Sequence, residues 1–289
     1  MFILDRRNFL ALTGAVALAP GIARAATGAE VFTADAMGGN VDSIVVMGDK
    51  GAVLIDAQMN VPNATKLANV IEATGRTLET IFISHHHPDH VLGLAVLMDR
   101  FPGAKPVTHA NIRPMIEKTA ESYLGYMSKQ APDAFAKRVV IPDALSADHI
   151  LLEGERLDIL DPMHGDTDLV SAVHIPALDT LVASDLAYTD CHVWLAENAR
   201  AERLDLWRAS LDRLEAVGAG TVIAGHRLEG SANDASAYAF TRAYLDKWQA
   251  ALGSTTTAEG LKAAMLEDAD GYGLVFAVDR AVGAVFPQG

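Results

Sequence analysis

The sequence predicts an α/β fold in which two β-rich layers are flanked by helices within one domain. Three observations predict it. Strand-like runs occur in both halves of the chain, helical patterns lie between and after them, and 50% of the 289 residues are hydrophobic. No low-complexity tract or long linker divides the chain. These features together favour one large core shared by the two layers.

The first half begins with short strands and continues with alternating helices and strands. Leu67, Val70 and Ile71 recur at helical spacing in the first predicted helix. The expected elements are strands at Val31–Thr33, Ser43–Met47 and Ala52–Asp56, a helix at Asn63–Thr74, a strand at Leu78–Ser84, a helix at Leu92–Arg100, a strand at Pro106–His109, and a largely helical stretch over 110–137.

The second half contains more strands and ends in helices. The expected strands are Ile150–Leu152, Arg156–Leu160, Leu169–His174, Thr180–Ser184 and Thr221–Ala224, and the expected helices are Leu204–Val217, Ala235–Leu252 and Ala258–Leu266.

Residues 1–25 are predicted to be an export signal and not part of the fold. A charged start with Arg6-Arg7 precedes a short apolar run and the small-x-small site Ala23-Arg24-Ala25. The paired arginines resemble the bacterial twin-arginine signal, which exports folded proteins. The alternative is an ordinary N-terminal helix with two chance arginines. We expect residues 26–289 to form a single domain that is located in the periplasm.

Charge and composition limit the classes of partner. A net charge of -14 repels phosphate backbones, which makes nucleic acid a poor partner. No segment after the signal approaches the ~20 apolar residues of a membrane span, so we expect no stable membrane anchor. The lone Cys191 excludes an intramolecular disulfide. A small-molecule substrate is the remaining expectation.

The stretch Ser84-His-His-His-Pro-Asp-His90 places four of the chain's ten histidines at the end of a predicted strand. Imidazoles and a carboxylate crowded at a buried strand end are costly unless a divalent cation neutralises them. His85 and His87 are two residues apart and can point to one side, whereas Asp89 and His90 can turn to a second centre. His86 has the opposite phase and is expected outside the ligand set. The pattern therefore predicts a metal site.

The motif His85-x-His87-x-Asp89-His90 resembles the signature of the metallo-β-lactamase-fold hydrolases. That resemblance implies an αββα sandwich of two mixed β-sheets flanked by helices, with one or two metals between the sheets. It also implies three later ligands at strand ends, which His164, Asp185 and His226 match in order. The resemblance covers essentially the whole chain after the signal.

One motif departs from the family pattern. Many members have Gly-His-Thr at the third motif, whereas this chain has His164-Gly165-Asp166-Thr167-Asp168. We predict His164 as the ligand and Asp166 or Asp168 as supports of the ligands. The alternatives for the ligand are His149 and His174.

The resemblance implies a binuclear centre. One metal is expected on His85, His87 and His164, the other on Asp89, His90 and His226, with Asp185 bridging them. Nitrogen and carboxylate ligands without thiolate suit two zinc ions, although iron, manganese or cobalt can occupy the same set. The two cations would supply hydroxide as the nucleophile, and Asp89 would orient it or move its proton. Asp56 matches a family aspartate that supports the metal-site loop.

Residues after Asp185 are candidates for substrate contacts. Tyr188 has the spacing at which lactonase-like members place a tyrosine that stabilises the oxyanion; the alternative is an aromatic packed beneath the metals. His192 and Trp194 are candidates for lining the pocket. The stretch 115–127 either packs in the core, caps an apolar acyl chain or lies against a second subunit, which leaves a homodimer open.

The expected function is periplasmic, zinc-dependent hydrolysis of a carbonyl ester, thioester, lactone or amide by a metal-bound hydroxide. Asp185 favours the thioesterase-like and lactonase-like branches, because β-lactam-hydrolysing members usually have cysteine or nothing at that position. The alternatives are a β-lactamase and a mononuclear-iron persulfide dioxygenase on the same fold.

Overall fold

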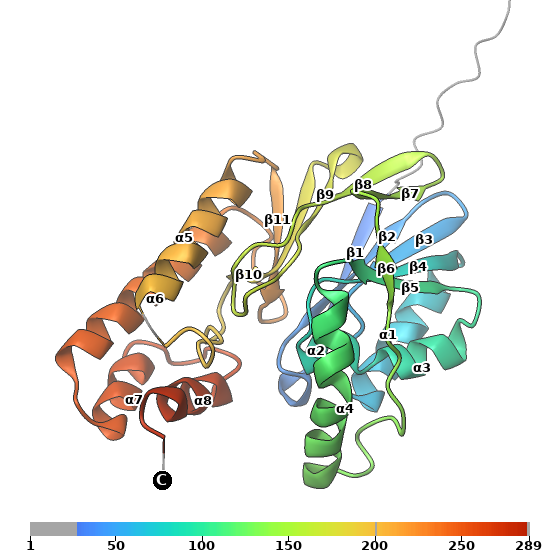
Figure 1. The fold of residues 1–289 in the computed structure, drawn as a ribbon. Coiled ribbons are helices and arrows are strands. Elements are labelled where there is room, and N and C mark those ends of the chain that lie inside the picture. The colour runs from blue at the N-terminus through green and yellow to red at the C-terminus, as the bar shows by residue number, and fades with distance from the viewer. Residues whose placement is uncertain (1–27, 200, 288–289) are drawn as a thin grey trace, which may run out of the picture.

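Two mixed β-sheets lie face to face between two groups of helices, as Figure 1 shows. The computed structural model describes residues 28–199 and 201–287. The predicted export signal at 1–25 lies outside these residues. The arrangement confirms the predicted αββα sandwich.

The first sheet has the order β1-β2-β3-β4-β5-β6. The pairs from β1 to β3 are antiparallel and those from β3 to β6 are parallel. Its strands are β1 (Gly28–Thr33), β2 (Asp42–Met47), β3 (Gly51–Ile55), β4 (Thr77–Ile83), β5 (Lys105–His109) and β6 (Asp143–Leu145).

The second sheet has the order β11-β10-β9-β8-β7, with β10 and β11 parallel and the other pairs antiparallel. Its strands are β7 (His149–Leu152), β8 (Glu155–Ile159), β9 (Val173–Ile175), β10 (Thr180–Tyr188) and β11 (Thr221–His226).

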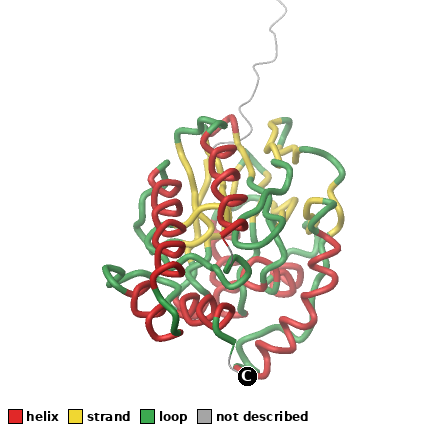
Figure 2. The backbone as a smooth tube through the Cα atoms, turned by 60° about the vertical axis from the view of Figure 1, so that its left-hand side comes forward, coloured by secondary structure: helices red, strands yellow, loops and turns green. Residues whose placement is uncertain are grey.

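The helices form the two outer layers, and Figure 2 shows them around the central strands. On the first sheet lie α1 (Val61–Ala73), α2 (Pro88–Val91), α3 (Leu94–Arg100) and α4 (Arg113–Gln130). On the second lie α5 (Ala201–Glu215), α6 (Ser236–Ser254), α7 (Ala258–Leu266) and α8 (Phe276–Val285). Two short 3-10 helices are η1 (Ala36–Gly38) and η2 (Pro176–Leu178). None of the helices that the structure describes is long and apolar enough to cross a membrane.

Alternation along the strands explains the sandwich. Ile44 and Val53 of the first sheet pack against the second sheet, whereas their neighbours Val45 and Leu54 pack under the helices. Successive side chains of a strand point to opposite faces, so a continuous apolar run buries both faces. The central strands consequently contain short continuous apolar runs, such as Ile44–Met47 in β2 and Ala52–Ile55 in β3.

The predicted helix Leu92–Arg100 starts earlier and is interrupted. The backbone N–H of Gly93 donates to the carbonyl of Gln58 at 2.8 Å, and a Cβ on Gly93 would lie 1.9 Å from the carbonyl oxygen of Ala57. Only glycine allows this approach, so the chain breaks into α2 and α3. The break presents Asp89 and His90 on a separate turn. Four elements were not predicted from the sequence: the three-residue β6, the C-terminal α8 and the two 3-10 helices η1 and η2.

Strand β10 is longer than predicted and contains the irregularity that positions the site. Its pairing with β11 shifts register on both sides of Ser184, whose φ is 48°. A bulge of this kind re-aims the neighbouring side chains. Asp185 and Tyr188 therefore lie within the strand and not in the loop that follows it.

Candidate metal centre

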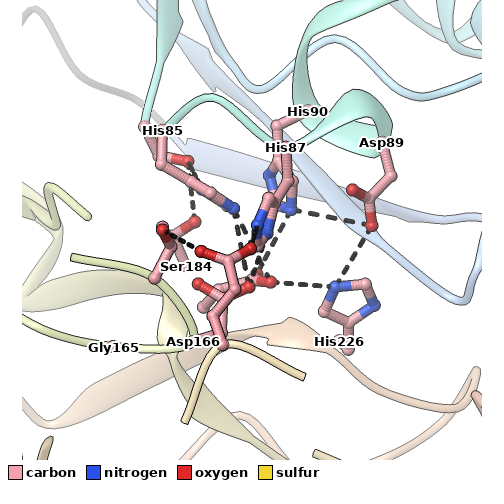
Figure 3. A network of polar contacts seen from close by, with 12 residues as sticks. His85, His87, Asp89, His90, Gly165, Asp166, Ser184 and His226 are labelled. Atoms are coloured by element: carbon pink, nitrogen blue, oxygen red, sulfur yellow. Dashed lines mark hydrogen bonds and ion pairs between the residues drawn. The ribbon is translucent and has the colours of Figure 1, made fainter. Parts of the chain in front are cut away.

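Histidines and aspartates from both sheets converge where β4 and β11 end and where β10 is irregular (Figure 3). The loop after β4 and helix α2 bring the motif of residues 85–90, and β10 and β11 bring Asp185 and His226. Among the described residues, three groups have their ligand atoms within 4.8 Å of one another, and two of them make up the centre: His85, His87, Asp166 and Asp185, and Asp89, His90 and His226. The third group, His86, His87 and Glu197, shares His87 with the first and includes an exposed glutamate.

Asp185 lies between the two groups. Its Oδ1 is 3.2 Å from His90 Nε2, and its Oδ2 is 3.1 Å from His226 Nε2 and 3.8 Å from His85 Nε2. A Cβ on Gly225 would lie 2.0 Å from this carboxylate, so glycine is required there for space. The position is the one predicted for a bridging carboxylate.

Three imidazoles present the same nitrogen to the centre. His226 Nδ1 donates to the carbonyl of Gly39 at 2.7 Å, His90 Nδ1 lies 2.8 Å from Asp56 Oδ2, and His85 Nδ1 lies 3.0 Å from Ser84 Oγ. A partner at Nδ1 sets the tautomer and the ring orientation. In each of the three residues Nε2 is left to face the centre.

Several of the converging atoms are buried and make no well-aligned hydrogen bond: His85 Nε2, His90 Nε2, Asp185 Oδ1 and both carboxylate oxygens of Asp166, of which Oδ2 lies 2.7 Å from His87 Nδ1. A buried polar atom without a partner costs free energy, and several such atoms aimed at one point cost more. A divalent cation would satisfy imidazole nitrogens and carboxylate oxygens together. The donor set therefore fits divalent metal.

The ionisation of the centre reflects the crowding. Burial raises the pKa of Asp166 to about 8, against the opposing effect of His87. Burial alone would raise the pKa of Asp185 too, but His226 and His90 hold it well below its usual value. Burial and the neighbouring His90 lower the pKa of His85 well below its usual value. The shifts of His85 and Asp185 favour neutral imidazole and ionised carboxylate, the forms that bind metal. Burial alone would lower the pKa of His226, but Asp185 raises it to about 9.

A pocket with a volume of about 280 Å³ opens above the centre. Asp89, Asp166, Asp185, His87 and His226 lie at its base. Most of its remaining wall is apolar or aromatic and includes Met59, Tyr123, Tyr126, Met127, Trp194, Leu274 and Phe276. Such a site, apolar with a few convergent polar groups, is typical of small-molecule binding.

The residues that line the pocket show which of the candidates from the sequence, His192, Trp194 and the stretch 115–127, reach it. Trp194 and the C-terminal part of the stretch 115–127 line it, whereas Ile116 is fully buried in the core under the first sheet. His192 does not line the pocket, because it is buried and its Nδ1 lies 2.9 Å from the hydroxyl of Tyr244.

Residues 36–226 match the family model of the metallo-beta-lactamase superfamily. The match spans well over half of the chain and contains every residue of the two groups. The chain belongs to the metallo-beta-lactamase superfamily. Members of this family bind divalent metals, which agrees with the donor set.

Individual relatives of the superfamily are distant. A hydroxyacylglutathione hydrolase from Ruegeria pomeroyi is 33% identical over 73 residues, which cover 25% of this chain and 27% of that enzyme. A metallo-beta-lactamase family protein from Thermus thermophilus has a TM-score of 0.59 at 20% identity, over 86% of this chain and 90% of that one. A metallo-beta-lactamase from Pontibacter korlensis has a TM-score of 0.53 at 21% identity, over 71% and 87%. The two structures share the fold with this chain.

The third motif of the superfamily is where the structure corrects the predicted ligands. Asp166, and not His164, lies in the group with His85 and His87. His164 Nε2 donates to Asn198 Oδ1 at 2.6 Å, and Asn198 Nδ2 donates back to the carbonyl of Asp166 at 2.6 Å. His164 thus holds the loop, while the residue after Gly165 points inward. The alternative His174 lies on β9, paired across to Leu181, and His149 contacts Asp148, so neither joins the centre.

Asp56 supports the centre as predicted. It accepts from the Ser84 backbone N–H and hydroxyl, both at 2.8 Å, and lies beside His90 Nδ1. Its φ of 63° lies in the left-handed region, which Asp tolerates better than most residues. One carboxylate therefore connects the metal-site loop to His90 and fixes the orientation of that ring.

Glu197 contacts the centre and was not among the residues predicted from the sequence. Its Oε1 lies 2.7 Å from His87 Nε2, and its Oε2 accepts from Thr167 Oγ1 at 2.7 Å. Burial alone would lower the pKa of His87, but Asp166 and Glu197 raise it well above its usual value. Glu197 lies 110 residues from His87 in a loop without regular pattern, so no sequence signal marked it.

Tyr188 does not occupy the predicted oxyanion position. Its hydroxyl donates to Asp185 Oδ2 at 2.8 Å, and its ring stacks on His226 with centroids 5.1 Å apart. The side chain is fully buried and lies outside the pocket wall. Tyr188 therefore orients two residues of the centre from below.

We expect Tyr188→Phe to weaken metal retention by about 10- to 100-fold, because the aromatic stacking remains but Asp185 loses its donor. Competition with a chelator of known affinity measures this. An oxyanion role would instead leave metal affinity intact and lower kcat for every substrate.

Proposed function

We propose that this superfamily hydrolase cleaves a carbonyl ester, thioester, lactone or amide at a centre of two divalent cations, zinc in the first instance. The observation that carries the proposal is the position of Asp185, between two groups of donors at the base of an apolar pocket. A bridging carboxylate is the feature of the ester- and thioester-cleaving branches noted above.

The residues have separate roles in this proposal. His85, His87 and Asp166 would hold one cation, Asp89, His90 and His226 the other, and Asp185 both. A pair of cations, when bound, lowers the pKa of water towards neutrality and polarises a carbonyl. Asp89 lines the pocket and its side chain is 17% exposed, so it is placed to accept a proton and return it to the leaving group.

The apolar wall of the pocket favours substrates with an apolar acyl chain over substrates with a polar one. Hydroxyacylglutathione, the substrate in the name of the Ruegeria pomeroyi relative, is an acyl thioester, which supports cleavage of a thioester bond. Asp185 in place of cysteine argues against a β-lactamase, and the likeness to β-lactamase structures concerns the fold alone. We further propose that residues 1–25 direct the enzyme to the periplasm.

A mononuclear-iron oxidoreductase of the persulfide dioxygenase kind is the second candidate. Two histidines with carboxylates form a group that suits iron, and Asp166 makes the first group richer in oxygen than a histidine would. Metal content separates the two candidates directly.

The first experiment is elemental analysis of the exported protein, combined with hydrolysis of an acyl-homoserine lactone, a glutathione thioester, nitrocefin and a p-nitrophenyl ester. Two zinc ions and turnover of the lactone, thioester or ester support the proposal. Turnover of nitrocefin alone identifies a β-lactamase. One iron without hydrolysis supports the dioxygenase, which oxygen consumption with a persulfide then tests.

Chelation should destabilise the fold. Each cation at about 100 times its Kd stabilises the folded state by about 2.7 kcal/mol, and removing it should lower Tm by roughly 5–10 °C per site. Thermal unfolding with and without a chelator measures the shift. The Asp185→Ala variant is the control, because a chelator acting through the centre should shift its Tm much less.

A further inference from the structure

A guanidinium lies at the mouth of the pocket, contributed by a helix outside the part that matches the family model. Arg280 on α8 donates from Nη2 to the hydroxyl of Tyr126 on α4 at 2.9 Å, and its guanidinium carbon lies 5.8 Å from that ring's centroid. Helix α4 packs on the first sheet and α8 on the second. The pair therefore spans the pocket mouth between the two halves of the sandwich.

Arg280 has no carboxylate partner in residues 28–199 and 201–287. Asp279, its neighbour on α8, is paired with Lys262 Nζ at 2.5 Å. Most other arginines among the described residues are paired with a carboxylate, for example Arg156 with Asp158 at 2.9 Å and Arg203 with Asp168 at 2.7 Å, whereas Arg76 donates to backbone carbonyls. A guanidinium has five N–H donors, and the bond to Tyr126 uses one.

The surroundings of Arg280 define what it can bind. It is the one lysine or arginine among the described residues that line the pocket, and its immediate neighbours in the wall include the apolar Phe276 and Tyr126. The buried side of α8, formed by Ala277, Val278 and Ala281, is embedded in the core, which fixes the direction in which Arg280 points. A single cation in an apolar wall suits a single anionic group attached to an apolar chain.

We propose that Arg280 selects substrates with one carboxylate, which it binds while the acyl chain lies on the aromatic wall and the scissile carbonyl reaches the centre. The planar fork of arginine matches a carboxylate with two parallel hydrogen bonds. A polyanion is disfavoured, because Asp89, Asp166 and Asp185 lie at the base of the same pocket. This inference rests on the proposed hydrolase function.

Two esters of matched length test it: p-nitrophenyl hexanoate, which is neutral, and the mono-p-nitrophenyl ester of adipic acid, which ends in a carboxylate. In Arg280→Gln the ratio of kcat/KM for the acidic ester to that for the neutral ester should fall about 10- to 100-fold, through KM. Arg280→Lys should recover part of the ratio. The matched control is Arg156→Gln, a paired surface arginine on β8, which should leave the ratio unchanged.

The Tyr126→Phe variant distinguishes two roles of Arg280: binding of the substrate carboxylate, and mechanical support of the pocket mouth through the bond to Tyr126. It removes the bond between α4 and α8 but keeps the aromatic wall. If Arg280 only braces the mouth, Tyr126→Phe and Arg280→Gln affect both esters alike, and the proposal is overturned. An unchanged ratio in Arg280→Gln overturns it as well.

A binding measurement keeps the test independent of catalysis. Trp194 lines the pocket, so its fluorescence reports occupancy, with Trp194→Phe as the blank. Octanoate should bind the wild type about 10-fold or more tightly than it binds Arg280→Gln, whereas 1-octanol should not distinguish them. If no ester is hydrolysed but octanoate binding depends on Arg280, the proposed function fails and the anion site stands. Equal octanoate binding by both proteins rejects the site.

Discussion

Asp185→Ala is expected to reduce the metal content to about one ion per chain or fewer and to lower kcat by more than about 100-fold. Its carboxylate is the group that faces His90, His226 and His85 at once, at 3.2, 3.1 and 3.8 Å. Loss of a residue that merely supports a ligand costs about 10- to 100-fold in affinity or activity, and loss of a shared ligand should cost more. Elemental analysis after dialysis and steady-state kinetics measure both quantities.

Asp185→Asn is the matched control, since it keeps the size of the side chain and an oxygen that can accept from Tyr188. It should fold like the wild type and retain more metal than the alanine variant. Unchanged stoichiometry and rate in Asp185→Ala, with the fold intact by circular dichroism, would remove Asp185 from the centre.

Asp166→Ala and His164→Ala should differ sharply, although the two residues are separated only by Gly165. Asp166 Oδ2 lies 2.7 Å from His87 Nδ1 and both of its oxygens are buried, whereas His164 contacts Asn198. We expect Asp166→Ala to lose one ion per chain and to lower kcat by more than about 100-fold. His164→Ala should keep both ions and lower kcat by about 10-fold or less, through the loosened loop.

Asp166→His sharpens the comparison, because it restores the Gly-His-Thr pattern of many superfamily members. It should keep the second ion that Asp166→Ala loses, and it should favour zinc over iron or manganese more strongly than the wild type does, since imidazole replaces a harder oxygen ligand. Elemental analysis after incubation with competing metals measures the metal content and the metal preference, and it does not depend on enzyme activity. Loss of metal in His164→Ala but not in Asp166→Ala would reinstate the ligand predicted from the sequence.

Local pattern was sufficient for the parts of the site that lie close together in the chain. His85, His87, Asp89 and His90 follow one buried strand, and the spacing alone divided them between two groups, as the structure does. The sandwich followed from strands in both halves and helices after them. Asp185 and His226 needed the family resemblance, because each of their motifs is weak by itself.

Contacts between distant segments were beyond the sequence. The motif favoured His164 over Asp166 as the ligand, but in the structure His164 is bonded to Asn198, 34 residues away, and Asp166 joins the group. Glu197 reaches His87 across 110 residues and Arg280 reaches Tyr126 across 154. Tyr188 has the spacing of a substrate contact, yet the bulge at Ser184 directs it beneath Asp185.

The sequence by itself thus determined the layers, the histidine motif and the presence of a candidate metal site, since strand and helix periodicities and close ligand spacing are local properties of the chain. The tertiary structure decided which carboxylate completes the first group and what orients each imidazole. It also decided that the guanidinium of Arg280 lines the pocket. Those choices depend on where loops from different strands meet in space, and that is set by packing of the whole sandwich.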